Sequence, residues 1–128
     1  MFPRRRLLLK TITETLRNLF SSGNLVLFSA NANWRTYTYQ LEPNTMYTAC
    51  FEGWDMSDFT DNQKKYVWNI SPDGSGTTYL LIYENNPQIF TTNDTGVVKF
   101  RYSPALSGKM NTTTFEELNA YFRIYKEG

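Results

Sequence analysis

The chain has 128 residues, which fits one domain of common size, and its formal net charge at neutral pH is +1. It has no histidine and a single cysteine. These counts exclude a Ser-His-Asp triad, a Cys-His pair, an intrachain disulfide and a zinc site built from several Cys and His ligands. No phosphate-binding or dinucleotide-binding motif occurs either. We therefore expect a non-enzymatic protein that uses no cofactor and no metal.

The charge is distributed unevenly along the chain. Residues 1–20 contain five basic residues and one acidic residue, which gives +4, and the remaining residues contain eight basic and eleven acidic residues, which gives −3. A mildly acidic body does not attract the phosphate backbone, so nucleic acid is not an expected partner. The basic front segment instead indicates contact with an acidic neighbour.

Apolar residues near the N-terminus recur at spacings of three and four, which predicts a basic amphipathic helix over 1–22. A helix this short is marginal alone in water, so its apolar face must pack against its own sandwich, a second copy or another protein. We expect the last of these. The expected contact residues are Arg4, Arg5, Arg6, Leu9, Lys10, Ile12, Leu16, Leu19 and Phe20.

From residue 23 onward the apolar period changes from helical to two, and turn residues recur every 8–12 residues. Aromatic residues make up 16% of the chain, a bias that favours strands. The predicted fold of 23–128 is an antiparallel β-sandwich, jelly-roll-like, with about eight strands, and a barrel is the alternative. The predicted strands are 24–29, 35–41, 46–53, 64–71, 77–83, 88–92, 97–102 and 120–126, with polar loops at 55–63 and 103–113.

The three tryptophans and the cysteine have different expected places. Trp68 lies in an alternating strand pattern, which predicts a core position, and Cys50 is expected to be a small buried apolar residue. Trp34 and Trp54 lie where strands begin or end. They are either exposed platforms for a sugar ring or packing residues at the sandwich edge.

The acidic residues Asp55, Asp58 and Asp61 share one predicted loop, with Glu52 nearby. The preferred interpretation is a solvated loop, in which Asp55 and Asp58 could also hydrogen-bond a glycan. A calcium site and a pair of catalytic carboxylates are the alternatives. The spacing is not that of an EF-hand, whose ligands occupy alternate positions.

The segment from Asn24 to Phe51, NLVLFSANANWRTYTYQLEPNTMYTACF, resembles the opening of carbohydrate-binding-module-like jelly-roll domains of phage tail and baseplate proteins. The resemblance rests on a first strand, a Trp and a turn leading into a strand, and it extends to the C-terminal AYFRIYKEG. The turn residues are Leu41, Pro43, Asn44, Thr45, Tyr47 and Thr48, and the closing residues are Lys126, Glu127 and Gly128.

This resemblance implies a structural protein of a phage virion, in the tail or as a capsid decoration. It would be present in several copies and docked onto other virion proteins by the front helix. The alternative is a glycan-binding module for attachment to the host surface, using Trp34, Trp54, Asp55 and Asp58. No membrane span is expected, because no apolar stretch approaches the ~18 residues that one requires.

Overall fold

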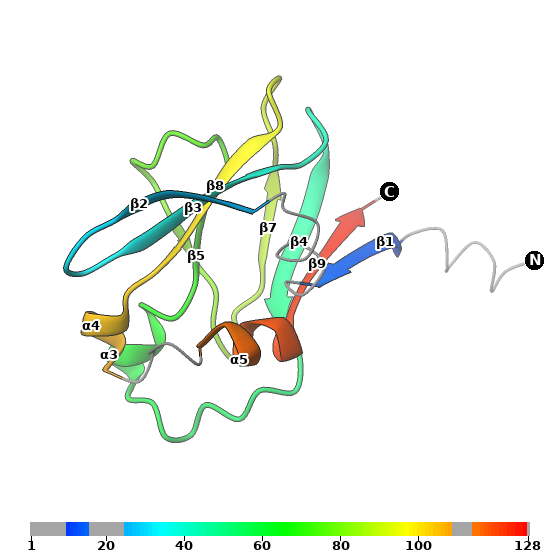
Figure 1. The fold of residues 1–128 in the computed structure, drawn as a ribbon. Helices are drawn as coiled ribbons and strands as arrows, with labels where there is room; N and C mark the ends of the chain where they lie inside the picture. Colours follow the sequence, from blue (N-terminus) through cyan, green and yellow to red (C-terminus); the bar gives the residue numbers. More distant parts are fainter. Residues whose placement is uncertain (1–9, 16–24, 109–113, 128) are drawn as a thin grey trace, which may run out of the picture.

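The computed structural model describes residues 10–15, 25–108 and 114–127, and it is mainly β, with two antiparallel sheets (Figure 1). One sheet has the order β1-β9-β4-β7 and the other β2-β3-β8-β5-β6. Because these are two separate sheets, the barrel alternative is wrong. The strands are β1 (Lys10–Thr15), β2 (Val26–Ala30), β3 (Arg35–Gln40), β4 (Met46–Phe51), β5 (Asn69–Ser71), β6 (Leu80–Leu81), β7 (Gln88–Thr91), β8 (Val97–Tyr102) and β9 (Phe122–Glu127).

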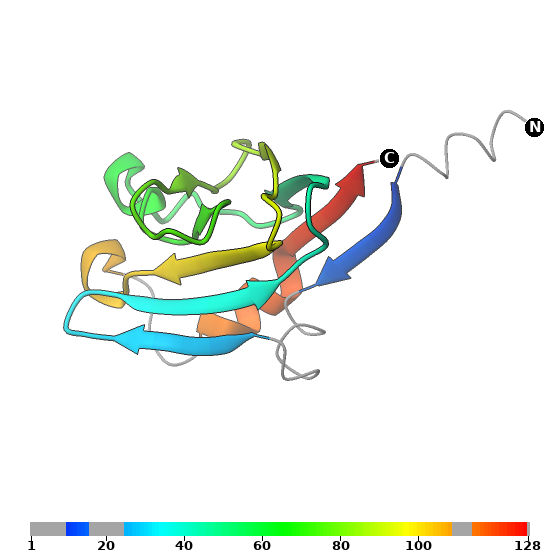
Figure 2. The ribbon, with the colours of Figure 1, turned by 90° about the horizontal axis from the view of Figure 1, so that it is seen from above.

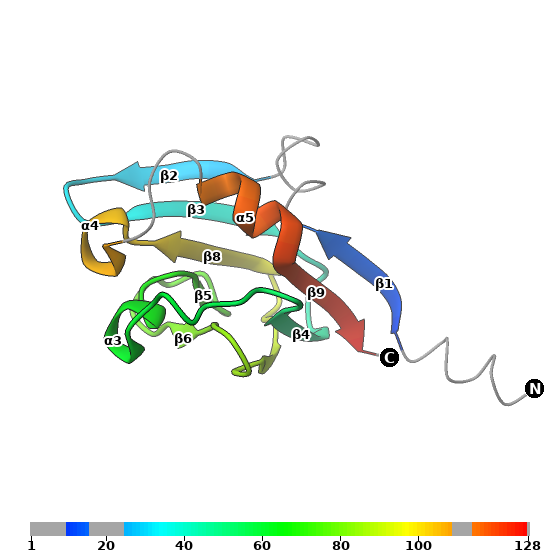
Figure 3. The same ribbon diagram turned by 90° about the horizontal axis from the view of Figure 1, so that it is seen from below.

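The predicted N-terminal helix is wrong for residues 10–15, which form strand β1 beside β9 (Figure 3). Ile12 lies opposite Lys126, and Thr15 lies opposite Arg123. Four of the six residues in KTITET are β-branched and favour a strand, and the free edge of β9 supplies hydrogen-bond partners that no isolated helix has. Lys10 and Ile12 are thus sheet residues. The other predicted contact residues, Arg4, Arg5, Arg6, Leu9, Leu16, Leu19 and Phe20, lie outside the described residues.

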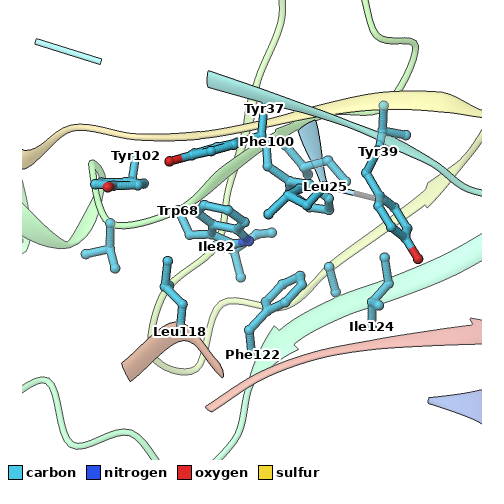
Figure 4. Close-up of a cluster of buried hydrophobic side chains, with 14 of the residues drawn as sticks. Leu25, Tyr37, Tyr39, Trp68, Ile82, Phe100, Tyr102, Leu118, Phe122 and Ile124 are labelled. Carbon is cyan, nitrogen blue, oxygen red and sulfur yellow. The ribbon is translucent and has the colours of Figure 1, made fainter. Parts of the chain in front are cut away.

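The two sheets enclose a core that is rich in aromatic rings (Figure 4). Trp68 is fully buried, as predicted, and stacks on Phe100 of β8 with ring centroids 5.0 Å apart. Phe122 at the start of β9 meets both rings edge-on, at 5.8 Å from Trp68 and 5.7 Å from Phe100. These contacts join the five-stranded sheet to the four-stranded sheet.

Strands β3 and β8 alternate as the sequence pattern predicts, and they run side by side with β2 (Figure 2). Tyr37 and Tyr39 of β3 are buried in the core, and so is Phe100 of β8. The period of two therefore places Lys99 and Arg101 of β8 on the outer face of this sheet. Thr36 lies directly opposite Arg101 on the same face.

Three short helices occupy segments for which no helix was predicted. Helix α3 (Asp61–Lys64) lies at the end of the predicted loop 55–63 and is started by a capping box, in which Thr60 and Gln63 bond each other's backbone. Helices α4 (Pro104–Ser107) and α5 (Thr114–Tyr121) lie in and after the predicted loop 103–113. Helix α5 leads directly into β9 and buries Leu118 (Figure 3).

Candidate functional site

The outer face of the five-stranded sheet carries an open groove of about 400 Å³, which we call the Arg101 groove. Its floor comes from β3 and β8, one wall from the β2–β3 hairpin and the other from the segment between β5 and β6. The lining residues are Phe28, Ser29, Asn31, Trp34, Thr36, Ser75, Gly76, Tyr79, Lys99 and Arg101. The groove thus combines aromatic rings, hydroxyl and amide groups, and two cations.

The guanidinium of Arg101 lies between two aromatic rings. Its Cζ atom is 3.8 Å from the ring centroid of Trp34 and 3.7 Å from that of Tyr79. Its Nε atom donates a hydrogen bond of 3.4 Å to Oδ1 of the buried Asn69. Asn69 is itself held, because its Nδ2 donates to the carbonyl oxygen of Lys65 at 2.9 Å. The guanidinium plane is therefore fixed by contacts on both faces and one edge.

Lys99 is the second cation of the groove. Its Nζ atom lies 3.9 Å from the ring centroid of Phe28. No acidic residue lines the groove, and within the described part of the chain neither Lys99 nor Arg101 forms an ion pair. Burial lowers the pKa of the Arg101 guanidinium from its ordinary value, but arginine stays charged at neutral pH.

Asp73 shapes the wall that carries Tyr79. Its Oδ1 atom accepts hydrogen bonds from the Ser75 amide at 2.9 Å and from the Ser71 hydroxyl at 3.3 Å. The Ser71 oxygen accepts in turn from the Gly76 amide at 3.1 Å. The hydrogen bond from Ser75 is the main reason that the pKa of Asp73 lies below its ordinary value. These bonds tie the loop to the end of β5.

Trp34 is positioned by the turn before it. The Oδ1 atom of Asn31 accepts from the amides of Asn33, at 2.9 Å, and of Trp34, at 2.8 Å. The Trp34 ring is half-buried and also contacts Tyr66, with centroids 5.9 Å apart. Trp34 is thus a wall of a groove, with Arg101 against its ring, and is not an isolated platform.

The other predicted sugar contacts do not join this groove. Trp54 is only 7% exposed, stacks on Tyr121 at 5.5 Å and meets Phe51 and Phe59 edge-on, so it is a packing residue of the core edge. Asp55 and Asp58 are exposed and do not line the groove.

The acidic loop is held by its own backbone. The Oδ1 atom of Asp55 accepts from the Ser57 amide at 3.0 Å, and this hydrogen bond lowers the pKa of Asp55. Asp61 lies in the first turn of α3. Among the described residues, no group of three Cys, Asp or Glu residues is placed to hold a metal ion.

A second hollow of about 350 Å³ lies on the outer face of the four-stranded sheet, around Glu52. Cys50 lines it and is half-buried, so the prediction of a buried residue is wrong. Cys50 follows the buried Ala49 and therefore faces outward. The Glu52 carboxylate is already engaged by the Tyr125 hydroxyl at 2.5 Å and by Nε of Arg123 at 3.5 Å. It is therefore less available to a ligand than the cations of the Arg101 groove.

Sequence reasoning missed Tyr79, Lys99 and Arg101 as site residues. The alternation of 97–102 could have placed Lys99 and Arg101 together on one face of a strand. No sequence signal brings Tyr79 to them, because it lies 22 positions before Arg101 and reaches it through a loop.

Comparisons with protein-family models, curated proteins and solved structures found no match for this chain. Within the described residues, no helix has the length and apolar character needed to cross a membrane.

Proposed function

We propose that this chain is a non-enzymatic recognition domain that binds carbohydrate in the Arg101 groove. The observation that carries the proposal is the groove itself, in which aromatic rings and hydrogen-bonding groups converge on the outer face of a sheet. A sugar needs apolar surface for its C–H face and polar groups for its hydroxyls. Trp34 and Tyr79 offer the first, and Asn31, Thr36 and Ser75 offer the second.

The strand order supports the finer fold assignment, a jelly roll. Without the edge strand β2, the order β1-β9-β4-β7 faces β3-β8-β5-β6. Successive strands alternate between the two sheets, apart from the β5–β6 pair, as in a double-sheet jelly roll with two Greek keys. This is the architecture implied by the sequence resemblance to carbohydrate-binding-module-like domains.

A glycan array probed with the full chain tests the binding proposal. We expect binding to at least one glycan class, and Trp34→Ala should weaken that binding tenfold or more. Ile89→Ala is the matched control, because Ile89 is exposed on β7 of the other sheet and should not affect binding. Absence of binding at millimolar ligand, or equal binding by both variants, would refute carbohydrate recognition in this groove.

We further propose that the domain acts on a phage virion, in a role of host-surface attachment. This setting rests on the sequence resemblance alone, and the anchoring helix has no part in it, since residues 10–15 are a strand. Mass spectrometry of purified particles from a phage that encodes the chain should detect it at a fixed ratio to the major virion proteins. Its absence from particles would contradict the virion setting.

A purely structural role in an assembly is the second candidate, favoured by the edge strand β2. Its three apolar residues Val26, Leu27 and Phe28 are each more than half exposed, and no strand of the described ranges pairs with its outer edge. Natural proteins usually protect such an edge. We propose that a second copy covers it, because two identical edges pair antiparallel about a two-fold axis.

Analytical ultracentrifugation tests this pairing. The wild-type chain should dimerise, and Leu27→Lys should be monomeric, because a charge on the edge blocks strand addition. The control is Met46→Lys, which places the same charge on an exposed apolar position of β4. A wild-type chain that stays monomeric at high micromolar concentration would contradict this second role.

A further inference from the structure

We infer that the Arg101 groove selects an acidic sugar, whose carboxylate is bound by Arg101 with Lys99 beside it. This inference rests on the proposed carbohydrate binding and specifies the class of ligand. It depends on three features of the groove. They are the unused edge of one guanidinium, the pairing of two cations without a carboxylate among the lining residues, and the combination of these cations with aromatic rings and with hydroxyl and amide groups.

The first feature is the unused hydrogen-bonding capacity of Arg101. Its Nε atom bonds Asn69, whereas its two Nη atoms donate to no acceptor within the described residues. A guanidinium has five N–H donors in a flat fork that matches a carboxylate with two parallel hydrogen bonds. Trp34 and Tyr79 already hold the plane of this fork, so little side-chain entropy is lost when it binds.

The second feature is the pairing of like charges. Lys99 and Arg101 are two positions apart on β8, about 7 Å along a strand, and both belong to the groove. The described ion pairs lie elsewhere, as Lys64–Glu84, Arg123–Glu52 and Lys126–Glu42. Two neighbouring cations without a protein counter-ion repel each other, and an anionic ligand relieves that repulsion.

The third feature distinguishes a sugar acid from a polyanion. The lining combines the two cations with hydroxyl and amide groups and aromatic rings in a groove of about 400 Å³. This volume suits one or a few sugar rings. The groove itself holds two cations, and the chain beyond residue 20 is mildly acidic, with eight basic and eleven acidic residues, so the groove gives a nucleic-acid backbone only a short cationic surface. The observations therefore favour a sugar acid over a nucleic acid.

The test measures binding of matched pairs of oligosaccharides that differ only in charge. Oligogalacturonate, hyaluronan oligosaccharides and sialyllactose are each titrated beside their methyl esters, by isothermal calorimetry with the full chain. At least one acid should bind tenfold or more tightly than its ester, and its affinity should fall as salt rises. A thymidine oligonucleotide of equal charge is titrated as a comparison.

Variants assign the effect to the groove. Arg101→Lys keeps the charge but loses the fork, so acid binding should fall about tenfold to a hundredfold, while ester binding changes little. Lys99→Gln should weaken acid binding less than Arg101→Lys does. Lys65→Gln removes an exposed cation outside the groove and should change neither affinity. Circular dichroism verifies that each variant is folded.

The outcomes separate the two proposals. Equal affinity for acid and ester, or an Arg101→Lys variant that binds the acid as well as wild type does, overturns the acidic specificity and leaves carbohydrate binding standing. If no acidic or neutral glycan binds, both carbohydrate binding and acidic specificity are overturned. Tighter binding of the oligonucleotide than of any sugar acid would replace the sugar by nucleic acid as the ligand.

Discussion

Replacing Trp68 by Phe should cost far less stability than its central position suggests. The indole is fully buried between Phe100 and Phe122, yet its Nε1 atom has no hydrogen-bond partner among the described residues. The substitution removes two buried apolar carbons besides the Nε1 atom, a loss of about 2 kcal/mol at ~0.8 kcal/mol for each carbon. It also removes a buried unsatisfied donor, whose desolvation costs about 1–3 kcal/mol. The two effects oppose each other, so the net change should lie within about 1.5 kcal/mol of zero.

Phe100→Leu is the matched control. It also removes about three heavy atoms from a fully buried ring of the same cluster. It removes no unsatisfied polar atom, so nothing offsets the expected loss of about 2 kcal/mol of stability. Trp68→Ala, which leaves a large cavity, should cost about 3–5 kcal/mol. Urea unfolding followed by far-ultraviolet circular dichroism measures all three, with m-values compared to ensure a common unfolded state. A Trp68→Phe variant that loses as much stability as Phe100→Leu would refute the role given to the unsatisfied indole nitrogen.

Three further predictions concern a turn, a half-buried phenol and the groove wall. Gly96→Ala should destabilise the fold by about 1–3 kcal/mol in urea unfolding, because Gly96 has a φ of +72° and a Cβ atom there would lie 2.3 Å from the Leu41 carbonyl oxygen; an unchanged midpoint would contradict this. Burial and the hydrogen bond to Glu52 raise the pKa of Tyr125 from 10.0 to about 12, so its contribution to stability is complete below pH 10 and is lost between pH 10 and 12. Tyr125→Phe should therefore lose less stability than wild type when unfolding is measured across that window, and identical losses would argue against the raised pKa. The pKa of Asp73 is lowered mainly by the Ser75 amide, so its contribution is present above 3.8 and is lost as the pH falls through the lower folded value. Asp73→Asn should abolish the acid titration of the Ser75 amide signal in NMR spectra, and a titration that persists would assign it to another group.

Local sequence patterns were sufficient where a strand alternates strongly between two faces. The segment VVKFRY was predicted as 97–102 and is β8 with the same bounds, and the burial of Trp68 was also predicted. In these segments the apolar residues are spaced at two, and only one side of a sheet can bury them. The composition excluded the common catalytic arrangements that need histidine, since the chain lacks that residue.

Patterns failed where a distant segment decides the outcome. The spacing of Leu9, Ile12, Leu16 and Leu19 suited a helix, but the β-branched run around Ile12 meets the open edge of β9, more than 100 residues later in the chain. Trp54 follows a strand, as a surface platform might, yet Tyr121 of the unpredicted helix α5 covers its ring. Periodicity describes which faces a segment has, and it does not identify what covers them.

The sequence by itself determined the mainly β character and the outward position of every second residue, because both depend on neighbouring residues. It also determined the absence of histidine chemistry, because that depends on composition. The Arg101 groove is different in kind. Trp34, Tyr79 and Arg101 are far apart in the chain, and only the pairing of β3 with β8 and the loop held by Asp73 bring two rings onto one guanidinium. Tertiary structure alone decided this site, because a contact between distant segments depends on how the sheets pair, which no local pattern of side chains specifies.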